Sequence, residues 1–154
     1  TGRANHIVEE ALLNGAVPEL AVSVGELQRE VRYGDRSRVD FVVGRGNSER
    51  YVEVKSVTSK EGAHAVFPDS VTTRGRKHMQ ELQKVVEAGG DATVFFLIQR
   101  PDVELMRPAW EIDPGYSEAL ANAQRAGVDI LAYCCQTSRE GIALSREIPM
   151  ELSK

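Results

Sequence analysis

Hydrophobic and polar residues alternate most regularly in two stretches of the chain, residues 37–44 (SRVDFVVG) and 51–57 (YVEVKSV). Alternation with a period of two is typical of strands that are buried on one face. The connecting residues 44–48, GRGNS, are of types that accept the backbone conformations of tight turns. Together the two stretches predict an antiparallel β-hairpin.

The same alternation assigns side chains to the two faces of this hairpin. Val39 and Phe41 are expected on one face of the first strand, and Asp40 on the other. On the second strand, Glu53 and Lys55 are two residues apart and are expected on one common face. The pattern therefore brings an acid and an amine to the surface side by side.

The length of the turn sets the register of the two strands. If residues 45–48 form the loop, Gly44 pairs with Glu49, and Asp40 then lies directly opposite Glu53. Two carboxylates with Cβ atoms about 5 Å apart destabilise a sheet, unless a cation lies between them. Two carboxylates with a main-chain carbonyl form a hard oxygen site of the kind that suits Mg²⁺ or Mn²⁺.

Helical spacing of hydrophobic residues predicts three helices. Asn5 is expected to cap a first helix over residues 6–14, and a longer helix is expected over residues 72–88. A third helix has Asp113 at its N-cap and runs to Ala126.

Further strands are expected, in chain order, at residues 26–33, 91–99 and 128–134, with an edge hairpin within 137–149. The second of them is a near-continuous apolar run, typical of a strand buried on both faces of a parallel sheet. Two segments are expected to be loops, residues 58–64 and 100–112. The first is polar and long enough to act as a mobile lid.

This order of elements predicts an α/β (α+β) fold with a mixed central sheet flanked by helices. The strand at 51–57, the helix at 72–88 and the strand at 91–99 would form one crossover between parallel strands. A chain of 154 residues with 42% hydrophobic residues can bury one substantial core. We therefore expect a single domain over residues 1–154.

Charge and cysteine content narrow the class of protein. The formal net charge is −4, so contact with nucleic acid would have to come from a local basic patch. The only cysteines, Cys134 and Cys135, are adjacent and lack the spacing of a zinc site or disulfide framework. No apolar run is long enough to span a bilayer and no secretory signal precedes the first helix, so a cytoplasmic protein without a membrane partner is expected.

An acid on one strand, followed after a turn by acid-x-lysine on the next, resembles the working motif of the PD-(D/E)XK nuclease superfamily. The triplet Glu53-Val54-Lys55 is common, and alone it equally describes a solvated surface strand. Longer blocks are more specific. The segments SRVDFVV, YVEVKSVT, VFPDSVTTRGRKHMQEL and IDPGYSEALANAQRAGVDILAY resemble, in this order, the sugar fermentation stimulation protein A (SfsA) family, and the resemblance covers the chain from about Ala4 onward.

The resemblance implies a restriction-endonuclease-like core and a set of site residues. Asp40, Glu53 and Lys55 would be catalytic, with Asp40, Glu53 and the Val54 carbonyl holding Mg²⁺ or Mn²⁺, and with Lys55 holding or deprotonating the attacking water. Glu30, on the strand beside the hairpin, and Glu10, in the first helix, are candidate outer-shell acids. Acids such as Glu10 early in a helix more commonly just stabilise the helix dipole.

Basic residues next to this cluster are candidates for binding phosphate groups. Arg74 and His78 are four residues apart and share one helix face, while Arg76 and Lys77 project outward beside them. Arg38 adds positive charge from the first hairpin strand. The alternatives are that His78 is a residue at the edge of the core and that the arginines between 29 and 38 pair with nearby acids.

Two functions fit these residues. In the first, the chain is a Mg²⁺- or Mn²⁺-dependent nuclease that acts on nucleic acid, DNA more readily than RNA. In the second, it is a non-catalytic DNA-binding regulator of sugar (maltose) metabolism genes. Many PD-(D/E)XK enzymes act as dimers, but no hydrophobic surface stretch of this sequence indicates one, so the choice between a monomer and a homodimer stays open.

Members of the SfsA family also carry an N-terminal domain resembling an OB-fold ahead of this region, and no segment of this sequence would supply it. The expectation is therefore a fragment or a reduced homologue of the family.

Overall fold

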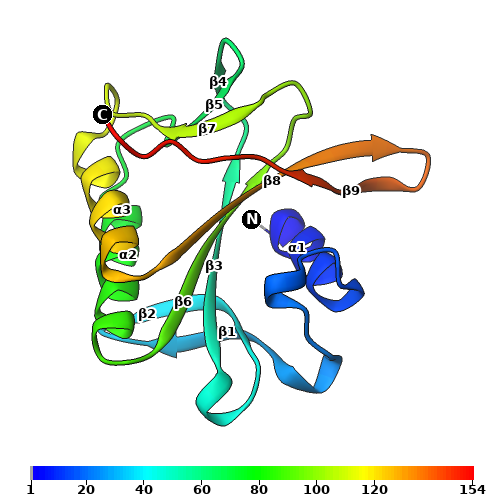
Figure 1. The fold of residues 1–154 in the computed structure, drawn as a ribbon, viewed down its shortest axis with the longest axis vertical. Helices are drawn as coiled ribbons and strands as arrows, with labels where there is room; N and C mark the ends of the chain where they lie inside the picture. The colour runs from blue at the N-terminus through cyan, green and yellow to red at the C-terminus, as the bar shows by residue number, and fades with distance from the viewer. Residues whose placement is uncertain (1) are drawn as a thin grey trace.

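The computed structural model describes residues 2–154 and consists of a twisted six-stranded sheet between helices (Figure 1). The helices are α1 (Gly2–Asn14), α2 (Thr73–Glu87) and α3 (Pro114–Ala126). The large sheet has the order β1-β2-β3-β6-β8-β9, and its strands are β1 (Leu27–Tyr33), β2 (Ser37–Val43), β3 (Arg50–Val57), β6 (Asp91–Ile98), β8 (Asp129–Ser138) and β9 (Gly141–Glu147). A smaller sheet has the order β4-β5-β7, with β4 (Lys60–Glu61), β5 (His64–Phe67) and β7 (Leu105–Pro108).

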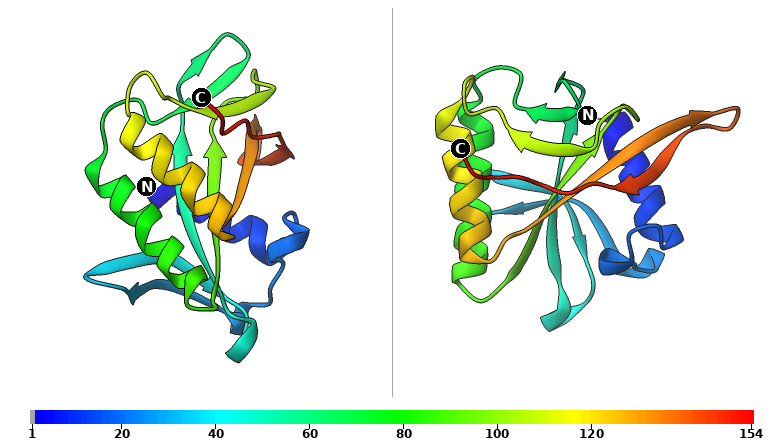
Figure 2. Two further views of the ribbon diagram at one scale, coloured as in Figure 1. Left: turned by 60° about the vertical axis from the view of Figure 1, so that its left-hand side comes forward. Right: turned by 45° about the horizontal axis from the view of Figure 1, so that its top comes forward.

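Helix α1 covers one face of the large sheet, and α2 and α3 together cover the other (Figure 2). Strand β6 shows why both faces are closed. Phe95 and Leu97 pack in the cluster that includes α1, whereas Val94, Phe96 and Ile98 pack in the cluster that includes α2 and α3. The predicted mixed sheet flanked by helices is therefore confirmed, as is the strand buried on both faces.

The connections place the strands in both directions. Strand β2 is antiparallel to its neighbours β1 and β3, and the chain then crosses through α2 so that β6 runs parallel to β3. The third helix starts at Pro114 after its N-cap Asp113 and stops before Gly127, whose φ of 118° is left-handed. These assignments follow the sequence prediction closely.

The two predicted loops are wrong in part, because each contributes short strands. Residues 60–61 and 64–67 form β4 and β5, and β5 pairs with β7 in the segment predicted to be a loop. The segment predicted as a lid is thus an ordered hairpin.

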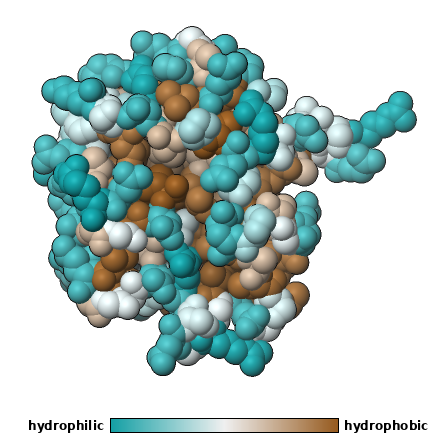
Figure 3. Space-filling model, viewed as in Figure 1, coloured by the Kyte–Doolittle hydropathy of each residue, from teal (hydrophilic) through white to brown (hydrophobic). Residues whose placement is uncertain are grey.

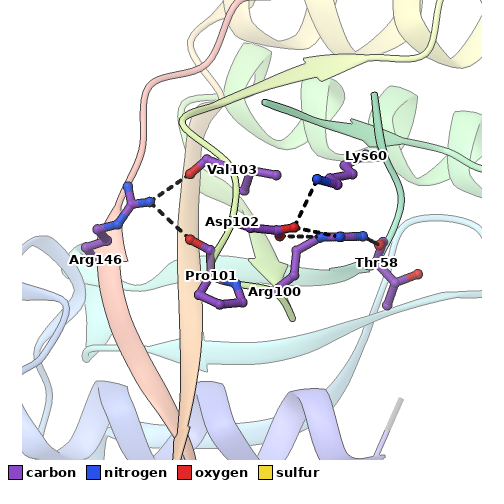
Figure 4. Close-up of polar contacts among 7 residues, drawn as sticks. All are labelled: Thr58, Lys60, Arg100, Pro101, Asp102, Val103 and Arg146. Carbon is purple, nitrogen blue, oxygen red and sulfur yellow. Dashed lines mark hydrogen bonds and ion pairs between the residues drawn. The ribbon is translucent and has the colours of Figure 1, made fainter. Parts of the chain in front are cut away.

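A group of charged side chains fastens this hairpin to the loop after β6 (Figure 4). Asp102 accepts hydrogen bonds from Arg100 Nε at 2.6 Å and forms an ion pair with Lys60 Nζ at 3.0 Å. Arg100 also donates to the Thr58 carbonyl at 2.9 Å, and Arg146 on β9 donates to main-chain carbonyls of the same loop. These contacts join segments about 40 residues apart in the sequence, which local periodicity does not show.

Strands β8 and β9 extend beyond the body as a hairpin whose tip is hydrophilic (Figure 3). Hydrophobic residues reach the surface near the centre of the same view, where the sheet and its covering elements meet (Figure 3). Within residues 2–154, no helix combines the length and the apolar composition needed to cross a bilayer.

Candidate active site

The predicted hairpin register is confirmed. The β2–β3 pairs are Phe41↔Val52, Val42↔Tyr51 and Val43↔Arg50. One step further along the same register, Asp40 lies opposite Glu53. The regular pairing stops before this position, so the two acids lie where β2 and β3 separate.

Asp40 replaces a main-chain partner at this break. Its Oδ2 accepts the Val54 N–H at 2.7 Å, a group that would otherwise bond to β2. Its Oδ1 accepts a hydrogen bond from Asn5 Nδ2 at 2.9 Å. Both carboxylate oxygens are therefore oriented by donors on two different elements.

The assignment of Asn5 as a helix cap is wrong, because α1 already begins at Gly2. Asn5 lies inside the helix and orients Asp40 instead. Nothing in the sequence connects these two positions, because residues 35 apart come into contact only through the packing of α1 on the sheet.

Strand β2 also changes face at Asp40. Val39 packs with the α2–α3 cluster, whereas Phe41 packs with the α1 cluster, so the expectation that they share a face is wrong. On the neighbouring strand Glu30 has φ 51°, and the regular β1–β2 pairing, which holds at Arg29 and Val31, is interrupted at Glu30, opposite Asp40. The local bend opens the sheet beside the acid.

Glu53 is the most enclosed acid of the site, with 4% of its surface exposed. Its Oε2 lies 3.0 Å from His78 Nδ1 and 3.4 Å from Lys55 Nζ, and the two nitrogens are 3.3 Å apart. The common face predicted for Glu53 and Lys55 is therefore observed. His78 contacts the acid directly, which the prediction of a phosphate ligand did not include.

The two acids differ in their ionisation. Burial alone would raise the pKa of Glu53, but the hydrogen bond from His78 and the charge of Lys55 outweigh it, and the pKa is lowered. Burial and then the charge of Glu53 raise the pKa of Asp40 to about 6. At neutral pH both carboxylates are ionised, and the charge on Asp40 is held at a free-energy cost.

The donor set fits a hard divalent cation. Asp40 and Glu53 supply carboxylate oxygens, and the Val54 carbonyl points to the same side of β3 as the Val54 N–H that reaches Asp40. Within residues 2–154 there is no group of three or more His, Cys, Asp and Glu side chains arranged to hold a metal. Such a two-carboxylate site resembles those of Mg²⁺, which keeps several water ligands and binds substrate phosphates.

A cleft of about 580 Å³ opens over the two acids. It is lined by Glu30, Arg36, Ser37, Arg38, Val39, Asp40, Glu53, Arg74, Lys77 and His78. A second hollow of about 540 Å³ adjoins it on the α1 side, sharing Glu30, Asp40 and Arg74 and adding Asn5 and Glu9. Residues from five elements, α1, β1, β2, β3 and α2, therefore meet around Asp40.

Two predicted residues lie elsewhere. Arg76 lines a separate hollow on the outer surface of α2 and α3, beside Glu87 and Glu118. Glu10 is exposed, and Glu9 occupies the place beside the cleft, where it forms an ion pair with Arg29. Side chains of neighbouring residues on a helix point about 100° apart. Lys77 and Glu9 therefore face the two hollows around Asp40, whereas their neighbours Arg76 and Glu10 do not.

The basic residues of the cleft are largely without acidic partners. Among the described residues, Arg36, Arg38 and Arg74 form no ion pair. Lys77 Nζ donates to the Asp35 carbonyl at 3.0 Å. The cleft thus presents positively charged side chains around the two carboxylates of Asp40 and Glu53.

The turn between β1 and β2 is seated tightly on α2. Gly34 has φ 58°, and a Cβ there would lie 2.3 Å from the carboxylate of buried Glu81. We expect Gly34→Ala to destabilise the protein by about 1–2 kcal/mol from backbone strain and about 1–3 kcal/mol more from overpacking. Gly62→Ala is the matched control, because Gly62 has φ 63° and open space around it. Equal midpoints in urea unfolding for the two variants would contradict close packing of this turn.

Comparison with known proteins identifies the family. The family description "Sugar fermentation stimulation protein RE domain" matches residues 2–141. The chain belongs to the SfsA family. The chain is 46% identical over 155 residues to the "Sugar fermentation stimulation protein homolog" of Pseudomonas paraeruginosa and 43% identical over 156 residues to that of Nitrosococcus oceani. Each comparison covers 99% of this chain and 66% of the relative.

A solved SfsA structure is similar throughout the described fold. It is the structure of Pyrococcus Furiosus SfsA in complex with Ca²⁺, and it matches this chain with a TM-score of 0.83 and 32% sequence identity. The similarity covers 94% of this chain and 62% of that one. This SfsA chain therefore spans about two thirds of the length of the relatives it matches, and the predicted family and fold are confirmed.

Proposed function

We propose that this SfsA chain hydrolyses phosphodiester bonds in nucleic acid, DNA more readily than RNA, with Mg²⁺ or Mn²⁺ held at Asp40 and Glu53. The observation that carries the proposal is the placement of two carboxylates, buried Glu53 and half-buried Asp40, beside Lys55 at the break between β2 and β3. A cluster used only to bind a phosphate backbone would gain nothing from two acids at its centre.

Support for a divalent ion comes from the site and from a relative. The charge on Asp40 is costly as long as Glu53 is ionised beside it, and a cation between them would offset that cost. The Pyrococcus Furiosus SfsA was solved in complex with Ca²⁺, an ion that prefers the same oxygen ligands. When bound, such an ion would polarise a phosphoryl oxygen and lower the pKa of water.

The surrounding side chains would position the acids and offset negative charge. Asn5 and the Val54 N–H orient the Asp40 carboxylate, and His78 holds Glu53. Lys55, with 15% of its side chain exposed, would place a positive charge next to the phosphodiester as negative charge develops on it. Arg38, Arg74 and Lys77 line the cleft and would bind neighbouring phosphates.

The test is a cleavage assay with wild type, Asp40→Asn and Lys55→Ala. Supercoiled, linear and single-stranded DNA, and RNA, are each incubated with Mg²⁺ or Mn²⁺, and with EDTA as a control. We expect cleavage that requires the ion and that both substitutions remove. DNA should be cleaved faster than RNA.

The outcome also distinguishes the regulatory alternative. DNA binding without cleavage, unchanged or improved by Asp40→Asn, would show a non-catalytic DNA-binding protein. Calorimetry that detects no uptake of Mg²⁺ or Mn²⁺ by the wild type would remove the metal site itself.

A further inference from the structure

The β1–β2 hairpin carries a concentration of positive charge, of which the proposed site chemistry uses only Arg38. Arg32 and Arg38 are directly opposite each other in the β1–β2 ladder. Side chains opposite one another in antiparallel strands lie on the same face, with Cβ atoms about 5 Å apart, and like charges in this arrangement are destabilising. Arg36 adds a third guanidinium from the turn.

Nothing in the described part of the chain neutralises these arginines. Arg32, Arg36 and Arg38 are all exposed, and within residues 2–154 no carboxylate lies within ion-pair distance of any of them. A hollow of about 290 Å³ is lined by these three residues and Ser37 alone. An anion bound from outside the chain would offset the repulsion among these three guanidinium groups.

Ser37 provides an independent sign of a polar ligand. Only 4% of its surface is exposed, and its Oγ has no hydrogen-bond partner among the described residues. Ser37 lines both the arginine hollow and the cleft over Asp40 and Glu53. A buried hydroxyl without a partner is costly, and a small side-chain rotation toward a bound oxygen would satisfy it.

The arginine hollow continues from the cleft. The two share Arg36, Ser37 and Arg38. The hairpin is held in this position by the bond from Lys77 Nζ to the Asp35 carbonyl. In the left view of Figure 2 the hairpin extends past α2, so it forms a ledge beside the helix.

We infer that the β1–β2 hairpin is a second phosphate-binding site, which guides the nucleic-acid backbone out of the cleft over Arg38, Arg36 and Arg32. This inference rests on the proposed function. The outer surface of α2 is excluded as the path, because its Arg76 and Lys84 lie among Glu87 and Glu118.

The hairpin would contact the phosphates of the nucleic acid and make no contacts with its bases. The aromatic side chains in residues 2–154 are buried or half-buried, so the described surface offers no fully exposed ring on which bases could stack. Binding is therefore expected to be insensitive to sequence and strongly weakened by salt.

Two double variants test the path. Arg32→Gln/Arg36→Gln removes two charges from the hairpin, and Arg76→Gln/Lys84→Gln removes two from the outer surface of α2. Fluorescence anisotropy with a short labelled duplex in EDTA, between about 50 and 200 mM KCl, measures affinity and its salt dependence without cleavage. Arg32 and Arg36 form no side-chain hydrogen bond within the described chain, and circular dichroism verifies that both variants fold.

The hairpin variant is expected to lose about tenfold or more in affinity, and the slope of log K against log salt should become shallower by about 2. The control should change by less than about twofold in affinity. Equal losses of affinity in both variants, or a hairpin variant that binds like wild type, would overturn the inference. In either case, metal-dependent cleavage by the wild type would leave the proposed function standing. Absence of both binding and cleavage in the wild type would overturn both.

Discussion

Lys55→Met is expected to lower the rate of metal-dependent DNA cleavage by about 10²–10³-fold while leaving the divalent-ion site in place. Lys55 Nζ lies 3.4 Å from Glu53 Oε2 and is mostly enclosed, so its charge acts at short range and in a medium that screens it weakly. Methionine keeps an unbranched, flexible side chain of similar length but provides no charge and no N–H donor. The loss should therefore fall on turnover and leave ion binding intact.

Two measurements separate this result from a general disruption of the site. Titration calorimetry should show that Lys55→Met still takes up Mn²⁺, whereas Asp40→Asn does not. Lys84→Met, which makes the same change on the outer surface of α2, should cleave at the wild-type rate. Cleavage by Lys55→Met within about threefold of wild type would remove Lys55 from the mechanism.

Asp40→Asn is expected to stabilise the ion-free protein at pH 8 by about 1–3 kcal/mol. Burial and the charge of Glu53 raise the pKa of Asp40 from 3.8 to about 6, so the folded state holds the Asp40 proton more tightly than the unfolded state does. That contribution is fully present below pH 4, is lost as the pH rises from about 4 to 6, and is absent above. Asparagine removes the charge and keeps an oxygen for the Val54 N–H, while the Asn5 amide can rotate to accept from the new amide.

The difference in stability between Asp40→Asn and wild type should change with pH and with added metal. Melting temperatures should differ by about 2–4 °C per kcal/mol at pH 8 and converge at pH 4, where Asp40 is protonated in the wild type. Mg²⁺ should raise the melting temperature of the wild type and leave that of Asp40→Asn unchanged. Asp91→Asn, at an exposed position, is the control for removal of a negative charge. A variant less stable than wild type at pH 8 would show that the Asp40 charge is already compensated within the chain.

His78 is buried in direct contact with Glu53. With 9% of its surface exposed and its Nδ1 at 3.0 Å from Glu53, the residue holds a site acid more directly than it could hold a phosphate. The sequence alone left a choice between a core-edge residue and a phosphate ligand. The structure supports a third role, in which His78 positions Glu53.

The sequence by itself determined those features that depend on one element or one turn. A period of two identified β2 and β3, and a loop of the right length fixed the register that sets Asp40 opposite Glu53. Caps and glycines marked α3 almost to the residue. These features were predictable because the hydrogen-bonding pattern within a helix or hairpin repeats at a fixed spacing.

Only the tertiary structure decided which side chains from different elements meet. The contacts of Asn5 with Asp40 and of His78 with Glu53 join residues from separate layers, and they depend on how α1 and α2 pack against the sheet. Packing also bent β2 at Asp40, so that Val39 left the face its alternation predicted. The physical reason is that local periodicity fixes directions relative to one backbone segment, whereas the position of that segment is set by the free energy of burying all the apolar surfaces together.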